Sequence, residues 1–425
     1  MAGIKDIILQ HKKEKENFLS KDYVLREKLD FAKKFLEADL IKVITGPRRA
    51  GKSVFSMLLL KNKDFSYLNF DDESLLKIEN SDEIIKGIFE VYSQPKFLLF
   101  DEIQNLKNWE LFVNKLQRRG YNLILTGSNA KLLSKELATS LTGRHIPLEI
   151  FPFNFREYLL AKDFLPKRGE IGLPEVKGKI LSYLDEYLRN GGFPEVVVKN
   201  LDPKTYLDTL FDAVLLKDVV KRYKVRFSQK IYDLALYLVS NFSGEFSFTK
   251  LKNILDFRSV TTLQNYLKYL EEAYLVFVLN RFSFKLKEQI KTAKKIYLVD
   301  NGFIFAKSFQ FSPNSGKLME NLVFTELLKR GYKANENIFY YKTRNKKEVD
   351  FVLKEGLKIK ALIQVFYQAG DLDTQEREEK ALVEASQELN CDNLLVITWD
   401  KEGEGKIKGK KIIFVPLLEW LLKNL

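Results

Sequence analysis

Residues 46–53 read GPRRAGKS, and they decide which fold the first third of the chain is expected to have. They match the phosphate-binding loop pattern G-x-x-x-x-G-K-[ST] at every fixed position and follow a short apolar run at residues 40–44. A buried strand that leads into such a loop lets backbone N–H groups surround a β-phosphate, and the next helix points the positive end of its dipole at the same place. The residues expected to bind ATP are Gly46, Pro47, Arg48, Arg49, Ala50, Gly51, Lys52, Ser53 and Val54.

A second motif assigns chemistry to this loop. Residues 96–100 form an apolar run that ends in Asp101 and Glu102, roughly fifty residues after the loop, which is a spacing typical of P-loop ATPases. Lys52 would reach the β- and γ-phosphates, and Ser53 would place its hydroxyl on Mg²⁺. Asp101 would hold the water shell of Mg²⁺, and Glu102 would polarise the attacking water.

Polar residues follow a third apolar run, at residues 121–125. Thr126, Ser128 and Asn129 could each orient the lytic water, and an ordinary turn is the alternative. Ser128 is taken as the catalytic candidate. Further along, Arg144 is a candidate for stabilising charge on the transferring phosphoryl group, in its own site or in a neighbour's, with a solvated surface arginine as the alternative.

Six stretches together carry a resemblance to a known family: GPRRAGKS, FDEIQN at 100–105, LTGSNAKLL at 125–133, SLTGR at 140–144, FPFNFREYL at 151–159 and GGFPEVV at 191–197. With them, nearly the whole chain resembles the archaeal and bacterial AAA+-type ATPases that have a winged-helix middle and a C-terminal domain related to restriction endonucleases. The resemblance implies ATP hydrolysis with Mg²⁺, an α/β core followed by a helical lid, and a connection to DNA.

Charge favours an anionic partner, and nucleic acid is the usual one. The 425 residues carry a net charge of +13. Two stretches concentrate it, with aromatic residues between the cations: Lys217, Lys221, Arg222, Lys224, Arg226 and Lys230, then Arg281, Lys285, Lys287, Lys291, Lys294 and Lys295. The residues taken as DNA-phosphate contacts are Lys221, Arg222, Lys224, Lys285, Lys287 and Lys291. The alternative is the solvated surface of a Lys-rich, heat-adapted archaeal protein.

Composition also bears on the compartment. No apolar stretch approaches the length of a membrane span, so we expect a cytoplasmic protein without a membrane partner. The single cysteine, Cys391, cannot form an internal disulfide and is expected to pack in a core.

The middle of the chain has the order of a winged helix. Residues 248–255 have helical spacing, Ser259 can cap a second helix over residues 260–274, and β-prone runs follow at 274–279 and 295–299. The exposed face of the second helix would carry Thr261, Thr262, Gln264, Asn265 and Lys268. Such side chains suit a DNA major groove, and Thr262 and Asn265 are taken as nucleic-acid contacts. A protein-binding module is the alternative.

The last third resembles a PD-(D/E)xK nuclease core. A helix is expected at residues 318–330 and a later one at 374–389, with strands at 338–341, 348–353, 359–366 and 393–398. In that resemblance Glu320, Asp350 and an acid at position 364 hold Mg²⁺, and a lysine at 366 activates water. This chain has Gln364 and Phe366 instead, which leaves a weak site of Glu320, Asp350 and Gln364. We therefore expect no strong nuclease activity, unless Lys342, Lys358 or Lys360 replaces the missing lysine.

These patterns predict an α/β fold with a P-loop AAA+-type ATPase core, a helical lid, a winged helix and a C-terminal α/β restriction-endonuclease-like domain. The expected divisions are an N-terminal helical segment at 1–40, with residues 23–26 near the adenine, the core at 41–150, the lid at 151–228, the winged helix at 229–310 and the last domain at 311–425. The expected function is a Mg²⁺-dependent ATP hydrolase that binds DNA and remodels it or acts on it. The alternatives are a nucleotide-switched signalling or defence scaffold that binds protein or RNA, and an ATP-regulated nuclease. We expect a homo-oligomer, with a hexamer as one candidate, because AAA+ sites are often completed by a neighbouring subunit.

Overall fold

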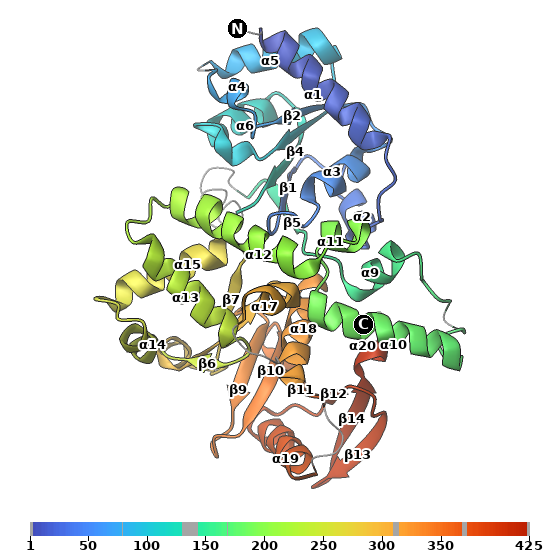
Figure 1. Cartoon of the computed structure of the whole chain (residues 1–425), viewed down its shortest axis with the longest axis vertical. Coiled ribbons are helices and arrows are strands. Elements are labelled where there is room, and N and C mark those ends of the chain that lie inside the picture. Colours follow the sequence, from blue (N-terminus) through green and yellow to red (C-terminus); the bar gives the residue numbers. More distant parts are fainter. Residues whose placement is uncertain are drawn as a thin grey trace. The chain divides into compact units, whose positions relative to one another are not determined.

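The computed structural model describes residues 3–78, 80–129, 143–167, 169–308, 314–367 and 372–422 (Figure 1). The chain forms two compact units. The first consists of Met1–Phe153 with Glu272–Tyr274, and the second of Asn154–Glu271 with Leu275–Leu425.

The described residues of the first unit contain a five-stranded sheet in the order β2-β3-β4-β1-β5. All its pairings are parallel. The strands are β1 (Ile41–Thr45), β2 (Phe65–Asn69), β3 (Phe97–Asp101), β4 (Asn122–Gly127) and β5 (His145–Glu149). The order places β4 between β1 and β3, so the polar residues at the end of β4 lie between the phosphate loop and the carboxylates.

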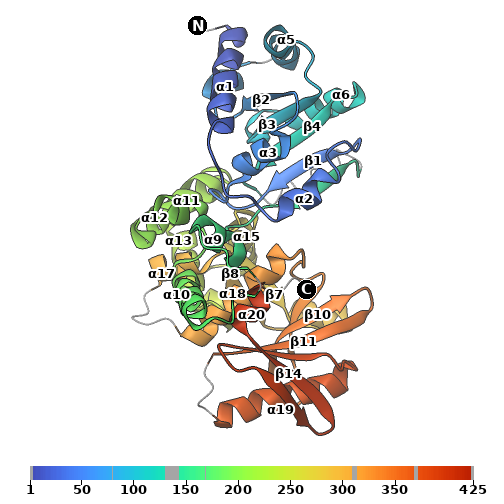
Figure 2. The same cartoon turned by 90° about the vertical axis from the view of Figure 1, so that its right-hand side faces the viewer.

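Helices cover both faces of this sheet (Figure 2). They are α1 (Ile4–Leu19), α2 (Lys28–Lys33), α3 (Lys52–Leu60), α4 (Glu73–Leu76), α5 (Ser81–Tyr92) and α6 (Trp109–Arg118). Side chains alternate between the faces along each strand. Val43 packs with α5 and α6, whereas its neighbour Ile44 packs with α2 and α3.

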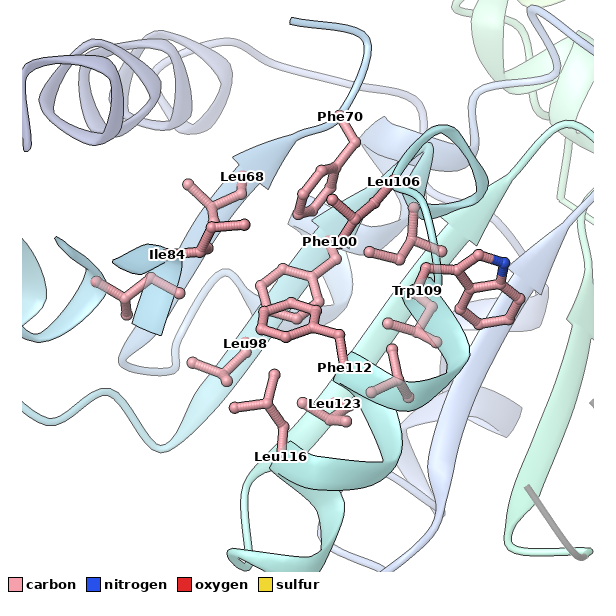
Figure 3. Packing of buried hydrophobic residues seen from close by; sticks show 14 of the residues in the cluster. Leu68, Phe70, Ile84, Leu98, Phe100, Leu106, Trp109, Phe112, Leu116 and Leu123 are labelled. Atoms are coloured by element: carbon pink, nitrogen blue, oxygen red, sulfur yellow. The ribbon is translucent and has the colours of Figure 1, made fainter. Parts of the chain in front are cut away.

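Aromatic rings fill the core on the α5/α6 side (Figure 3). Phe100 packs against Phe70 and Phe112, at ring-centroid distances of 5.7 and 5.5 Å. Burying both faces in this way explains why the strands are nearly continuous apolar runs in the sequence, as parallel strands usually are. The result is a rigid sheet whose carboxyl edge carries the loop and the carboxylates.

The second unit begins with helices. They are α9 (Phe155–Ala161), α10 (Pro174–Asn190), α11 (Pro194–Lys199), α12 (Pro203–Ala213), a π-helical continuation at Val214–Lys221, and α13 (Ser228–Ser240). Proline opens α10, α11 and α12, where its missing N–H costs no helical hydrogen bond.

A small helix-and-strand module follows. Its helices are α14 (Phe248–Ile254) and α15 (Val260–Glu272), and its strands β6 (Glu245–Phe246), β7 (Val276–Asn280) and β8 (Lys294–Leu298) form an antiparallel sheet in the order β6-β8-β7. Between β7 and β8 lies the short helix α16 (Leu286–Lys291), and after β8 comes α17 (Asn301–Lys307). The two expected helices and two expected strands are present. The expected end of the second helix at Tyr274 was wrong, because α15 ends at Glu272 and Tyr274 has a left-handed backbone with φ 57°.

The last part pairs one long helix with a mixed sheet. The elements are α18 (Ser315–Lys329), β9 (Ile338–Lys342), β10 (Glu348–Glu355), β11 (Lys358–Phe366), α19 (Leu372–Leu389), β12 (Leu394–Thr398), β13 (Gly403–Ile407), β14 (Lys410–Pro416) and α20 (Leu417–Leu422). In the described residues the sheet order is β13-β14-β12-β11-β10-β9. Cys391 is buried in the core beneath α19, as expected. The sequence did not predict the β13–β14 hairpin, whose turn residues Lys408 and Gly409 both have positive φ.

Candidate nucleotide-binding site

The loop after β1 requires glycine at both fixed positions. Gly46 has φ 142°, and a Cβ there would lie 2.0 Å from the carbonyl oxygen of Ile150. Gly51 has φ 89° and immediately precedes α3. The two glycines therefore have backbone conformations that other residues rarely adopt. These conformations let the loop backbone form a tight concave turn of the kind that binds a phosphate group.

Lys52 begins α3, so the first-turn N–H groups of the helix lie at the loop. Its side chain is buried, and Nζ donates a hydrogen bond of 2.9 Å to the carbonyl oxygen of Pro47. The ammonium group is thus held among loop backbone groups, where a bound phosphate would offer it a charged acceptor.

The N-terminal segment fixes the same loop from outside. The guanidinium of Arg26 donates to the carbonyl oxygens of Ala50 at 2.9 Å and Phe151 at 2.6 Å. Lys28 donates to the carbonyl oxygen of Glu149 at 2.8 Å. The sequence placed residues 23–26 near the adenine, but it did not predict that Arg26 would hold the loop backbone.

Asp101 connects β3 to its two neighbouring strands, β2 and β4. It is the last residue of β3 and is buried, and its carboxylate accepts hydrogen bonds from the hydroxyls of Thr126 and Tyr67. Burial raises the pKa of Asp101, and the nearby Glu102 raises it further, while hydroxyl groups of Thr126 and Ser53 lower it. Ser53 and Asp101, the two expected Mg²⁺ contacts, therefore lie together, and this oxygen pair fits a hard divalent cation.

Glu102 lies just outside the strand with a left-handed backbone, φ 51°. Its N–H donates to the hydroxyl oxygen of Thr126 at 3.1 Å. Its Oε2 accepts hydrogen bonds from Ser128 at 3.3 Å and from Gln104 at 2.5 Å. Uncommon backbone at a non-glycine residue is concentrated at functional sites. The structure thus brings the expected general base together with Ser128 and adds Gln104, which lies in the FDEIQN stretch but had no predicted role.

The three polar residues after β4 differ in what they contact. Thr126 is hydrogen bonded to Asp101 and to the backbone of Glu102, whereas Ser128 contacts the carboxylate of Glu102. Asn129 is buried beside them in the chain. Ser128 therefore contacts the carboxylate of the expected base directly.

Arg144 lies at the wrong edge of the sheet to serve its own site. The register pairs Ile41 with His145 and Thr45 with Glu149, so Arg144 precedes the amino end of β5 while the loop follows the carboxyl end of β1. Five residues at about 3.3 Å each separate these ends by roughly 15 Å. The side chain is exposed. A role in its own site was therefore a wrong expectation, and the role in a neighbour's site stays a prediction.

Tyr274 is a contact of the loop strand that the sequence did not reveal. Its hydroxyl lies 3.0 Å from Oγ1 of Thr45, the residue before Gly46, and donates to Oε1 of Glu149 at 2.9 Å. Tyr274 is distant in sequence, and no local pattern marks it.

The two basic stretches are only partly available to a partner. Lys221, Lys224, Lys285, Lys287 and Lys291 are exposed. Arg222 is half-buried and pairs with Asp218 at 3.2 Å. On α15, Asn265 is exposed and Thr262 is half-buried.

Lys295 does not belong to the cationic surface expected from the second stretch. Its side chain is buried and ion-paired with Glu320, Glu348 and Asp350.

Three residue ranges match known domain families. Residues 38–159 match an AAA domain, and residues 181–312 and 315–419 match two domains of unknown function, DUF8612 and DUF4143. The chain is 40% identical over 400 residues to the uncharacterized protein MJ1544 of Methanocaldococcus jannaschii, covering 90% of this chain and 88% of that protein. It is 31% identical over 425 residues to an uncharacterized protein of Haemophilus influenzae, covering 95% and 100%.

Two solved structures are similar to the chain at low sequence identity. The Walker-type ATPase paby2304 of Pyrococcus abyssi is similar with a TM-score of 0.40 and 15% identity, covering 68% of this chain and 96% of that one. The Orc1 protein of Aeropyrum pernix in complex with DNA is similar with a TM-score of 0.32 and 11% identity, covering 74% and 97%. Within the described residues of our chain, none of the helices has both the length and the apolar character needed to cross a membrane.

Proposed function

This chain belongs to the family that includes MJ1544 of Methanocaldococcus jannaschii, and on that premise we propose that it is a Mg²⁺-dependent ATPase that binds DNA and couples ATP binding and hydrolysis to action on it. The observation that carries the ATPase part is the meeting of Ser53, Asp101 and Glu102 at the carboxyl edge of one sheet. The AAA domain match over residues 38–159 spans all three.

In the proposed reaction the loop backbone and Lys52 bind the β- and γ-phosphates. Ser53 and Asp101 are the residues that would hold Mg²⁺, which when bound supplies positive charge to the transferring phosphoryl group. Positioning and charge compensation supply most of the rate enhancement of phosphoryl transfer. The tight loop at Gly46 and the hydrogen-bonded ammonium group of Lys52 support a role of this loop in positioning the phosphates.

Glu102 is proposed to accept a proton from the attacking water. Ser128 and Gln104 hold its carboxylate through Oε2, so they would set the direction in which the other oxygen points. They are positioning residues in this proposal, since they act through Glu102.

The DNA part rests on the module at residues 245–298. Two helices followed by strands β7 and β8, with β6 as a third strand, support the winged-helix interpretation. The exposed side of α15 carries Thr261, Gln264, Asn265 and Lys268. The carboxylate of Glu271, also on α15, is directed to β7, because its Oε1 accepts the N–H of Val278 at 3.1 Å.

The connection between β7 and β8 would be the wing. Lys285, Lys287 and Lys291 are exposed on it and could contact phosphates. The same connection exposes Phe284 by 75%, Leu286 by 69% and Ile290 by 65%. These apolar side chains favour the second candidate function, a nucleotide-switched scaffold that binds protein, because neighbouring exposed apolar groups often mark a protein-interaction site.

We also infer that the active assembly has more than one copy. Arg144 cannot reach its own loop across the sheet, so it can assist hydrolysis only at a neighbouring loop. The order of assembly, including a hexamer, is measurable by light scattering with and without ATP.

The experiment that tests the proposal is ATP turnover measured with no nucleic acid and with single-stranded, duplex or branched DNA, at several salt concentrations. We expect stimulation by DNA that weakens steeply as salt rises, because phosphate contacts release counterions. Turnover that no DNA stimulates would favour the protein-binding scaffold. A protein that neither binds nor hydrolyses ATP would contradict the ATPase itself.

A further inference from the structure

Carboxylates from α18 and β10 converge on one buried ammonium group in the second unit. Nζ of Lys295, on β8, lies 2.8 Å from Oε1 of Glu320, 2.6 Å from Oε1 of Glu348 and 3.2 Å from Oδ1 of Asp350. The Lys295 side chain is 2% exposed. The ammonium group donates hydrogen bonds to Glu320 and Asp350, and it forms an ion pair with Glu348.

The remaining groups hold these carboxylates in place. Tyr297 donates to Oε1 of Glu320 at 2.6 Å, and the N–H of Val365 donates to Oδ2 of Asp350 at 2.9 Å. Gln364 accepts the N–H of Asp350 at 3.2 Å and donates to Glu378 at 2.5 Å. Glu320, Asp350 and Gln364 thus each have a hydrogen-bond partner on β8, β10, β11 or α19. One carboxylate oxygen from each of Glu320, Glu348 and Asp350 is in contact with Nζ of Lys295.

Glu320, Asp350 and Gln364 are the residues that the nuclease resemblance assigned to Mg²⁺, so the fit to that ion can be tested. Magnesium binds oxygens at about 2.0–2.1 Å in near-octahedral geometry and usually keeps several waters. Here the centre between the carboxylates is the Lys295 ammonium group at hydrogen-bond distances. The amide of Gln364 is directed to the Asp350 backbone and to Glu378. Among the described side chains, no group of three or more His, Cys, Asp or Glu residues is arranged to hold a metal. The residues present do not fit Mg²⁺.

The geometry points to Lys295 as a built-in cation that takes the place of a divalent metal ion among Glu320, Glu348 and Asp350. The C-terminal domain is then organised around an internal ion cluster and does not use metal-dependent cleavage. The cluster also joins β8 to α18 and β10, so it links the proposed DNA module to the last domain within the second unit. This inference goes beyond the proposed ATPase and does not depend on it.

Electrostatics in the cluster agrees with the geometry. Burial lowers the pKa of Lys295, but Glu320, Tyr297, Asp350 and Glu348 outweigh it and raise that pKa well above the ordinary value. The ammonium group therefore stays charged. A buried ammonium group is tolerated only while its carboxylate partners are present, and the buried carboxylates are likewise tolerated only while the ammonium group is present.

The test uses the full chain without nucleotide and compares Lys295→Met with Lys358→Met, which removes an exposed lysine from β11. We expect Lys295→Met to lower the melting temperature by about 10 °C at neutral pH and Lys358→Met to leave it nearly unchanged. The loss in Lys295→Met should shrink at acid pH, where the carboxylates become protonated. Mn²⁺ should raise the melting temperature of Lys295→Met and leave that of the native protein unchanged. Equal melting temperatures for the two variants would overturn the inference.

A second set of measurements keeps the inference testable if Lys295→Met does not fold. Adding Glu320→Gln and Asp350→Asn to Lys295→Met removes the uncompensated charges and should restore folding, whereas a triple variant no better than the single one would contradict us. The native protein should leave plasmid and branched DNA intact with Mg²⁺ or Mn²⁺, with or without ATP. Stabilisation of the native protein by Mn²⁺ that Asp350→Asn abolishes, or DNA cutting that Asp350→Ala abolishes, would show that the cluster takes a metal.

Discussion

At the scale of single residues, the nucleotide site depends on backbone conformations that most side chains avoid. Gly46 and Gly51 have positive φ, and so do Arg49 and Glu102. The glycines could be predicted from the loop pattern, because the pattern exists to satisfy this geometry. The left-handed backbone of Glu102 could not, since a sequence does not show which non-glycine residue the surrounding contacts will hold in a strained conformation.

Gly46→Ala tests the tight turn of the phosphate loop directly. The new Cβ would meet the Ile150 carbonyl oxygen at 2.0 Å, so the loop must move. Gly120→Ala is the matched control, because Gly120 also has positive φ, 82°, while no described heavy atom lies within 4 Å of its Cβ position. We expect the control to cost about 1–2 kcal/mol of unfolding free energy and Gly46→Ala to cost about 1–3 kcal/mol more, with loss of ATP binding. Equal costs and retained ATP binding would mean that Gly46 does not shape the loop.

Asp350 gives a pH dependence of stability. Burial and the nearby Glu320 raise its pKa to about 7, although Lys295 lowers it. The folded state therefore binds a proton more tightly than the unfolded state, and ionisation of Asp350 costs stability above its folded-state pKa. The cost is absent below the unfolded-state pKa, near the ordinary aspartate value of 3.8, and grows as the pH rises toward about 7.

We therefore expect the unfolding free energy of the native protein to fall relative to that of Asp350→Asn between pH 4 and 7, and then to level off. Denaturant titrations of both proteins across this range measure the difference. A difference that grows in the opposite direction would show that the partners of Asp350 favour its charged form.

At the scale of elements, prediction succeeded where a single pattern determines the outcome. The strand, loop and helix around residues 41–60 follow from an apolar run and a fixed motif. The helices expected at residues 248–255 and 260–274 follow from helical spacing and are present at 248–254 and 260–272. The β13–β14 hairpin was missed because its first strand, GEGKI, has two glycines and no apolar alternation. The predicted end of α15 lay too far along the chain. Tyr274 has a left-handed backbone, and its hydroxyl contacts Thr45, which is distant in sequence, so local spacing does not show that the helix ends before it.

Tyr274→Phe measures the value of that contact. The change removes a hydroxyl that is hydrogen bonded to Thr45 and Glu149 and keeps the buried ring. We expect a loss of about 1–3 kcal/mol in unfolding free energy, with weaker ATP binding because Thr45 leads into the loop. Tyr269→Phe, on α15, is a control that keeps the ring stacked on Tyr223 at 4.0 Å. Equal ATP affinity in the two variants would leave Tyr274 with a role in stability alone.

The connection between β7 and β8 is the element on which the DNA proposal depends most. Reversing the charge of Lys285, Lys287 and Lys291 should weaken DNA binding for all sequences and reduce its salt dependence, by roughly one unit of slope for each lysine that no longer binds a phosphate. The matched control reverses Lys333, Lys358 and Lys408, three exposed lysines of the last domain, and so changes the net charge equally. Fluorescence anisotropy over a salt series gives both quantities. If the affinity falls equally in the two triple variants, net charge explains the binding and the connection is not a contact surface.

At the scale of the whole molecule, the parallel-sheet ATPase core could be predicted because its motifs and their spacing are specific. The order β2-β3-β4-β1-β5 brings the ends of three expected strands together. The residues predicted to act on ATP therefore lie at one edge of the sheet: Lys52, Ser53, Asp101, Glu102 and Ser128. Long-range contacts were the part that the sequence could not supply. Arg26, Tyr67 and Tyr274 reach the site through side-chain hydrogen bonds, and Lys295 reaches the carboxylates of the last domain from β8.

The central claim is that Glu102 activates water in an ATPase site built on Lys52 and Asp101. It is tested most directly by measuring ATP affinity and single-turnover hydrolysis in Glu102→Gln, with Lys52→Ala and the exposed Glu83→Gln as controls. We expect Glu102→Gln to bind ATP with near-native affinity while hydrolysis falls by roughly 10²–10⁴-fold. Lys52→Ala should lose both, and Glu83→Gln neither. Near-native hydrolysis by Glu102→Gln would contradict the claim.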